Sequence, residues 1–326
     1  MYQKSKEIGF LSPNSLDLKD RKLLLELFST EKKFKTDISK KLLISKEMLS
    51  YRLKRLKSEG ILQNISPIID YAKLGYHIYR LQLQYHSTTK EQKEEVMTYL
   101  KEISELSWLV ELAGSWDIAI GFKIKDTERF EEIYTQIITK YGGIIKNKLF
   151  TIVSSIEHLS PNYIQPGDRQ RILTGKNYDK IELEENAKKI IIELNKDGQL
   201  TLSELAKRLK VSITTIRYHL EFLESKKIIV GYKPIINATK LGFEHFKIVL
   251  ELADTSKKNL AKEILGQNNN VIYITESLGK YDLEFEAEFE KVDDVLRLIE
   301  ELKEKIDLTN SEIIFSNKEV LVKEIL

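Results

Sequence analysis

The sequence predicts an α+β fold in which one module occurs twice in tandem, and two observations support this. First, residues 38–85 align without a gap on residues 205–252 at a constant shift of 167 positions, and 15 of the 48 pairs are identical. At ordinary composition about three identities would be expected by chance. Second, each copy opens with short helical patterns and continues with alternating strand and helix patterns. The period is far longer than the roughly 20–50 residues of a solenoid repeat, so each copy is a whole module.

The first part of each copy predicts three short helices. Ser45 and Ser212 stand immediately before the third helix of their copies, where a hydroxyl can cap free backbone amides. Thr201 and Glu204 have the spacing of a capping box at the start of a second helix. The expected helices cover residues 17–29, 37–43 and 46–58 in the first copy and residues 184–196, 202–209 and 213–226 in the second.

The connection between the second and third helices is very short in both copies. Residues 43–45 and 210–212 leave so few positions that the two helices must cross steeply, which is the geometry of a helix-turn-helix. A β-rich stretch follows at residues 61–70 and 228–237, and its place and length fit a wing hairpin. Each copy therefore predicts a winged helix-turn-helix.

The second part of each copy predicts the element order β-α-β-β-α-β. This is the order of a ferredoxin-like domain. Glu284, Glu286 and Glu288 alternate with apolar residues, as in a half-exposed strand. The expected elements cover residues 77–86, 90–103, 107–113, 118–125, 127–141 and 147–157, then 245–253, 256–265, 271–278, 283–289, 291–305 and 311–317.

These patterns divide the chain into five parts. Between the copies, Pro161, Pro166 and Gly167 lie in a stretch without periodicity, which we interpret as an extended linker. The expected parts are a winged helix-turn-helix at 1–75, a ferredoxin-like domain at 76–158, the linker at 159–182, a second winged helix-turn-helix at 183–242 and a second ferredoxin-like domain at 243–326.

The composition excludes several classes of protein. There is no cysteine, which excludes disulfides and thiolate metal sites. The five histidines show no metal-ligand spacing, and nucleotide-binding and nucleophile-elbow motifs are missing, so we expect no catalytic residues, metal or cofactor. The N-terminus lacks the apolar stretch of a signal peptide, and no apolar run approaches the roughly 18 residues that span a bilayer. We therefore expect a cytoplasmic protein without a membrane partner.

The net charge of +2 hides an alternation that follows the repeat. The segments 1–75, 76–158, 159–242 and 243–326 carry net charges of +7, −2, +5 and −8. A basic module is the electrostatic footprint of phosphate binding, so double-stranded DNA is the expected partner. The alternative is ordinary solvated surface charge.

Taken together, these motifs resemble the Lrp/AsnC family of leucine-responsive and asparagine-operon regulators. Leu16-Asp17-x-x-Asp20 resembles the family's opening, and the segment from Arg52 to Ile61 resembles its recognition helix and exit. The turns Gly114–Asp117 and Gly279–Asp282 match the Gly-x-x-Asp turn of the family's effector (RAM) domain. The resemblance implies a DNA-binding transcriptional regulator that responds to a small effector, typically an amino acid. Ordinary members carry one module, whereas this chain carries two.

Candidate DNA-binding residues lie on or beside the third helix of each copy, because recognition helices enter the major groove. In the second copy His219 replaces Arg52, and Glu221 replaces Lys54, so we expect weaker binding there and a smaller loss from His219→Ala than from Arg52→Ala. Solvated helix faces, or packing roles for the tyrosines, are the alternatives. The candidates are Lys46, Ser50, Tyr51, Arg52, Lys54, Arg55 and Lys57, then Thr214, Thr215, Arg217, Tyr218 and His219.

Candidate effector-binding residues lie in the two Gly-x-x-Asp turns. Glycine permits close backbone approach, and aspartate can cap amides or bind an amino group. Both residue types are equally common in purely structural turns, and the tryptophans are also expected in cores or interfaces. The candidates are Gly114, Ser115, Trp116 and Asp117, then Gly279, Lys280, Tyr281 and Asp282.

Two other functions stay open at this point. Siroheme decarboxylases resemble the same module pair, but their Arg-rich segment and histidine near the wing are missing from residues 64–75 and 232–242. A sensor or assembly protein without DNA binding is the other alternative. We expect a homo-oligomer in which the two effector domains of one chain pair as a pseudo-dimer, while pairing of like repeats between chains is the alternative.

Overall fold

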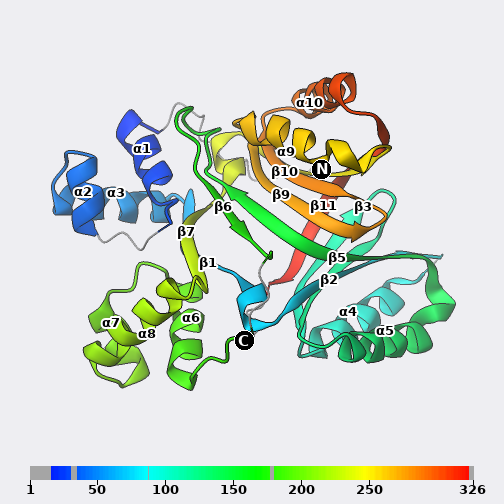
Figure 1. Ribbon diagram of the computed structural model, residues 1–326, viewed down its shortest axis with the longest axis horizontal. Helices are drawn as coiled ribbons and strands as arrows, with labels where there is room; N and C mark the ends of the chain where they lie inside the picture. The colour runs from blue at the N-terminus through cyan, green and yellow to red at the C-terminus, as the bar shows by residue number, and fades with distance from the viewer. Residues whose placement is uncertain (1–15, 31–34, 87, 177–179, 323–326) are drawn as a thin grey trace, which may run out of the picture.

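The computed structural model describes residues 16–30, 35–86, 88–176 and 180–322 (Figure 1). The first 15 residues of the expected first domain lie outside this range. Two three-helix units lie at one end of the molecule, on either side of a two-stranded ribbon, and a large curved sheet with four helices lies at the other end. No helix in the described part of the chain is long and apolar enough to cross a membrane.

The three-helix units form where the sequence predicts them. Ser45 and Ser212 cap the third helices by accepting the amides of Met48 and Thr215, and Thr201 forms the expected capping box. The helices are α1 (Leu18–Glu26), α2 (Lys35–Lys41) and α3 (Lys46–Ser58) in the first copy, then α6 (Glu185–Lys196), α7 (Leu202–Leu209) and α8 (Ile213–Ser225) in the second.

The prediction of a wing hairpin within each copy is wrong. Each copy supplies one strand, β1 (Leu62–Ile69) or β7 (Ile229–Ile236), and these two strands pair with each other in antiparallel register. Neither stretch contains a turn that could fold it back on itself, so the free backbone groups of one strand find partners on its duplicate. We call this pair the ribbon.

The ribbon joins the two helical units around one hydrophobic core. Buried side chains from both copies, including Leu24, Leu53, Ile191 and Leu223, form a single cluster. The loop after α6 also touches the strand of the other copy, because the Gly198 amide donates to the Ile65 carbonyl at 2.9 Å. The helix-turn-helix units are therefore fixed relative to each other through side chains as well as through backbone pairing.

The remainder of each copy adopts the expected β-α-β-β-α-β order. The strands of each copy pair in the order fourth, first, third, second, as in a ferredoxin-like sheet. The first copy comprises β2 (His77–Tyr85), α4 (Lys90–Glu102), β3 (Leu106–Ala113), β4 (Ile118–Ile124), α5 (Thr127–Tyr141) and β5 (Ile145–Leu159). The second comprises β8 (Glu244–Leu252), α9 (Lys258–Gln267), β9 (Val271–Gly279), β10 (Leu283–Phe289), α10 (Val292–Lys305) and β11 (Leu308–Val322).

The last strand of each copy is longer than predicted because it pairs with both copies. One part of β5 pairs with β2 of its own copy and another with β9, while β11 pairs with β8 and then with β3. Eight strands thereby close into a ring, which we call the closed sheet. The two ferredoxin-like domains of one chain pair with each other, and the helices α4, α5, α9 and α10 cover the outside (Figure 1).

The segment between the copies is more ordered than an extended linker. It contains the strand β6 (Arg171–Thr174), which pairs with the end of β5. Asn162 is fully buried and donates to the Gly167 carbonyl, and Ile164 joins the core of the helical units. The absence of sequence periodicity reflects irregular packed structure here, because a segment without a repeating apolar face can still be buried residue by residue.

Adding one methyl group at Gly198 should test how the helical units depend on the ribbon. A Cβ atom there would lie 2.1 Å from the Ile65 carbonyl oxygen, so Gly198→Ala must displace either the loop or the strand. We expect a loss of roughly 2 kcal/mol or more in the free energy of unfolding, measured by urea denaturation. Gly143→Ala is the matched control, because its Cβ would meet nothing within 4 Å. Equal stability of the two variants would contradict the close contact.

Candidate nucleic-acid interface

The recognition helix of the first copy presents a polar and aromatic face to solvent. Its apolar face, formed by Leu49, Leu53 and Leu56, is buried. Lys46 and Lys54 are exposed, and Tyr51 is 62% exposed. Ser50 and Lys57 are half-buried, and Lys57 pairs with Asp197 of the other copy at 3.7 Å. An exposed helix with these cations is suited to contact DNA phosphates and base edges.

Arg52 and Arg55 lie differently from what their sequence position suggests. Arg52 Nη1 donates to Asp17 and Asp20 at 2.7 Å, and its side chain is only 14% exposed. Arg55 also pairs with Asp20, which is fully buried. These contacts hold α3 against the start of α1. Both arginines therefore form ion pairs within the protein, which weighs against Arg52 as a leading DNA contact.

The same charge cluster stabilises the first turn of α1. Asp17 is the N-cap residue, and it forms a capping box with Asp20. Burial opposes ionisation of Asp17, but hydrogen bonds from Arg52 and from the Asp20 amide outweigh it and lower the pKa of Asp17. The Leu16-Asp17-x-x-Asp20 motif is therefore structural in this chain.

The recognition helix of the second copy is less basic and contains a buried histidine. Thr214, Arg217 and Tyr218 are exposed, the last by 60%, and Thr215 is half-buried. His219 is only 4% exposed, and its Nε2 atom lies 4.0 Å from Glu184. His219 thus lies near the N-terminal end of α6, and its burial weighs against a contact with DNA.

The junction between the first and third helices differs between the copies. At the constant shift of 167 positions, Ala187 replaces Asp20 and Phe222 replaces Arg55. One copy therefore joins these helices through buried ion pairs, and the other joins them mainly through apolar packing. The two units have the same order of helices but unlike side chains at this junction.

The aspartates of both Gly-x-x-Asp turns bind the protein's own backbone. Asp117 accepts the Tyr85 amide at 2.7 Å, and Asp282 accepts the Leu252 amide at 2.9 Å. Lys93 and Lys258 lie 3.8 and 3.5 Å from the same two carboxylates. Each aspartate thus fastens the turn to the end of a neighbouring strand, and this contact supplies a structural reason for the motif.

The other turn residues are divided between surface and interface. Gly279 packs closely on β5, whereas a Cβ at Gly114 would meet nothing within 4 Å. Ser115 and Lys280 are exposed. Tyr281 is 1% exposed, and its hydroxyl donates to Glu312 at 3.2 Å. Burial and then the charge of Glu312 raise the pKa of Tyr281 to about 12.

Sequence reasoning missed a cavity beneath the ribbon. Its basic lining residues, Arg80, Lys123, His158 and Lys233, come from four different strands. They are separated by 35 or more positions along the chain, so no local motif could have indicated them. The one available signal was Lys123, a cation within an otherwise apolar strand pattern.

The fold and the exposed recognition helices define a helix-turn-helix protein, and comparisons with known proteins agree. The winged helix-turn-helix DNA-binding family matches residues 183–230. An uncharacterised HTH-type transcriptional regulator of Pyrococcus furiosus is 31% identical over 117 residues, which are 35% of this chain and 76% of the relative. A second such regulator from the same organism is 29% identical over 119 residues, which are 36% of this chain and 80% of the relative.

The chain therefore belongs to the HTH-type transcriptional regulators. One solved structure shares the fold of nearly the whole chain. The siroheme decarboxylase NirDL matches with a TM-score of 0.66 at 15% identity, covering 94% of this chain and 92% of that chain. At this identity the likeness shows a common fold and nothing about chemistry.

Removing the charge of Asp20 should reduce stability, because Arg52 and Arg55 would lose their shared buried partner. We expect Asp20→Asn to lower the free energy of unfolding by about 3 kcal/mol, the lower end for a broken buried ion pair, since both arginines keep some access to water. Urea denaturation measures this. Lys54→Ala, on the exposed face of the same helix, should change stability by less than about 0.5 kcal/mol. If Asp20→Asn lowered the free energy of unfolding by no more than Lys54→Ala does, the structural role of the cluster would be refuted.

Proposed function

We propose that this DNA-binding regulator reads an asymmetric DNA site through α3 and α8. The observation that carries the proposal is the placement of the two recognition helices on one ribbon, each with an exposed polar face. Tyr51 and Tyr218 are equivalent positions and are 62% and 60% exposed, which favours contact with a partner over packing in the core.

The two recognition helices differ in charge where DNA phosphates would lie. Lys46, Lys54 and Lys57 of α3 correspond to Ile213, Glu221 and Glu224 of α8. Phosphate contacts supply most of the sequence-independent affinity for DNA. The first copy should therefore provide most of the electrostatic attraction, while Thr214 and Arg217 offer polar contacts from the second.

We further infer that the regulator responds to a small effector and that several copies assemble. Both inferences rest on the Lrp/AsnC resemblance, in which the effector is typically an amino acid. The backbone role of Asp117 and Asp282 weakens the case for direct effector contact by these two carboxylates.

A regulator fits the sequence better than an enzyme. The curated relatives are regulators, whereas NirDL shares the fold at 15% identity. Residues 64–75 and 232–242 contain neither arginine nor histidine, although a decarboxylase resemblance would place both near the wing. We therefore propose that the chain has no catalytic activity of its own.

Lys54→Ala should weaken binding to every DNA sequence by a similar factor. Its side chain is exposed on α3, and loss of one phosphate contact should reduce the slope of log affinity against log salt by about 1. Fluorescence anisotropy with the DNA upstream of this protein's own gene, against a shuffled control, measures both quantities. Lys101→Ala removes an exposed cation from α4 and is the matched control. Indistinguishable variants would argue against contact through α3.

Selection from a random DNA library should yield a site with unlike halves, because operator symmetry mirrors protein symmetry and the two recognition helices differ. Two symmetric sites can be made from the selected site by replacing either half with a copy of the other. Both should bind more weakly than the selected site, because one recognition helix would then face the wrong half. Anisotropy on the three DNA duplexes measures the difference. A perfect palindrome as the best-bound sequence would contradict two unlike reading helices in one chain.

A further inference from the structure

Large apolar side chains are exposed at the start of both recognition helices. Of the 14 that are exposed among the described residues, five lie within residues 43–51 and 210–218. Each of these segments is the turn before the third helix and the first six residues of that helix. Exposed apolar residues that stand alone are ordinary, whereas a concentration of them indicates a contact surface. The five are Leu43, Met48 and Tyr51 in the first copy and Ile213 and Tyr218 in the second.

The local structure of α3 places Met48 and Tyr51 on one side of the helix. Ser45 caps the helix by accepting the Met48 amide at 3.1 Å, so Met48 is the third helical residue. Tyr51 follows three positions later, and residues with this spacing are neighbours on a helix surface. Leu49 and Leu53 are buried in the core, whereas Met48 is 44% exposed. The start of α3 therefore presents apolar surface to whatever binds it.

The charge beside Met48 favours base edges over phosphates. Glu47 is exposed at the second position of α3, and the exposed Lys46 precedes it, so this end of the helix is not uniformly basic. Hydrogen bonds from its own backbone amide and then from Ser45 lower the pKa of Glu47, which keeps its carboxylate charged at neutral pH. A carboxylate repels a phosphate but can accept a hydrogen bond from the amino group of cytosine. The exposed Lys54 lies about two turns further along, where a phosphate contact is favourable.

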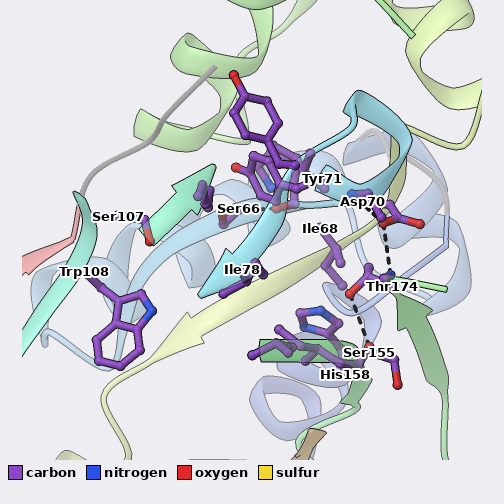
Figure 2. Close-up of a pocket in the computed structure, with 18 of the residues that line it drawn as sticks. Ser66, Ile68, Asp70, Tyr71, Ile78, Ser107, Trp108, Ser155, His158 and Thr174 are labelled. Atoms are coloured by element: carbon purple, nitrogen blue, oxygen red, sulfur yellow. Dashed lines mark hydrogen bonds between the residues drawn. The ribbon is translucent and has the colours of Figure 1, made fainter. Parts of the chain in front are cut away.

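Other aromatic side chains near the ribbon face inward. Tyr71 and Trp108 line the cavity between the ribbon and the closed sheet (Figure 2). Tyr232, on β7, is buried. Among the described residues of the helical units, the exposed aromatic side chains are Tyr51 and Tyr218. Any aromatic contact that these units make with DNA therefore comes from the recognition helices.

We propose that Met48 reads thymine in the half of the DNA site bound by the first copy, by packing against the 5-methyl group of that base. Thymine is the base that presents an apolar group in the major groove, so an exposed apolar side chain on a reading helix has this favourable partner there. Methionine suits the contact because its thioether chain is flexible and polarisable. This specificity rests on the proposed entry of α3 into the major groove, and it adds the base that α3 recognises.

The second copy presents its apolar side chain at a different position. Thr215 replaces Met48, is half-buried and shares a hydrogen bond with Ser212 at 2.8 Å. Ile213 replaces Lys46 and is exposed at the first position of α8. A thymine read by the second copy would therefore lie at a different place in its half-site, which agrees with a site of unlike halves.

Replacing thymine by uracil in the selected site tests the contact, because uracil lacks only the methyl group. Among single replacements, at least one should weaken binding about fourfold, as expected for one buried methyl group. Met48→Ala should weaken binding to the thymine site to a similar degree, and the same replacement should then have no further effect. Fluorescence anisotropy on DNA with and without the replacement measures this double-mutant cycle.

Two variants serve as controls. Ile213→Ala should keep the sensitivity to the uracil replacement that Met48→Ala abolishes, because Ile213 lies on the other recognition helix. Leu296→Ala removes an exposed apolar side chain from α10, and it should change neither the affinity nor the sensitivity to uracil.

Three outcomes would overturn the thymine contact. If no uracil replacement weakens binding, or if the loss persists in Met48→Ala, while selected DNA still binds more tightly than shuffled DNA, the DNA-reading proposal stands and the thymine contact alone fails. Equal binding of selected and shuffled DNA would remove both. Self-association of the DNA-free protein that Met48→Ala abolishes, seen by sedimentation velocity, would assign the apolar surface to a contact between copies.

Discussion

The antiparallel pairing of β1 with β7 is the interaction on which the rest of this molecule depends. A two-stranded ribbon is marginal in water unless helices pack on it, and here the helices of both copies share one core around it. The strands come from different copies, so neither helix-turn-helix unit can complete its own structure alone. The spacing and direction of α3 and α8 follow from this shared ribbon.

Equivalent positions of the two copies carry different side chains within the same order of elements. Ala187 stands at the helical junction where the first copy has Asp20, and Glu288 stands in the second copy where the first has Lys123. In the closed sheet, Arg80 of one copy lies against Glu284 of the other, with both side chains nearly buried. Pairing of two acidic copies would leave such carboxylates buried without a cation, which is costly. Unlike copies in one chain therefore make the favourable pair.

The ribbon lies between the recognition helices and the cavity at the closed sheet. Its outer side carries the recognition helices, and its inner side covers the basic cavity through Ile68 and the adjoining Tyr71. The Gly-x-x-Asp turns lie instead on the closed sheet, where Asp117 and Asp282 hold strand ends.

The sequence by itself determined the two modules, most helix and strand limits, the caps at Ser45 and Ser212, and the exposed face with Tyr51 and Lys54, because these follow from local periodicity and spacing. Tertiary structure alone decided which partner each strand and charge would find. The ribbon, the closure by β5 and β11, the capture of Arg52 by Asp20 and the burial of His219 all join residues far apart in the chain. A local pattern shows that a side chain is basic or that a segment is a strand. Which carboxylate pairs with that side chain, and which strand pairs with that segment, depends on how the two copies pack.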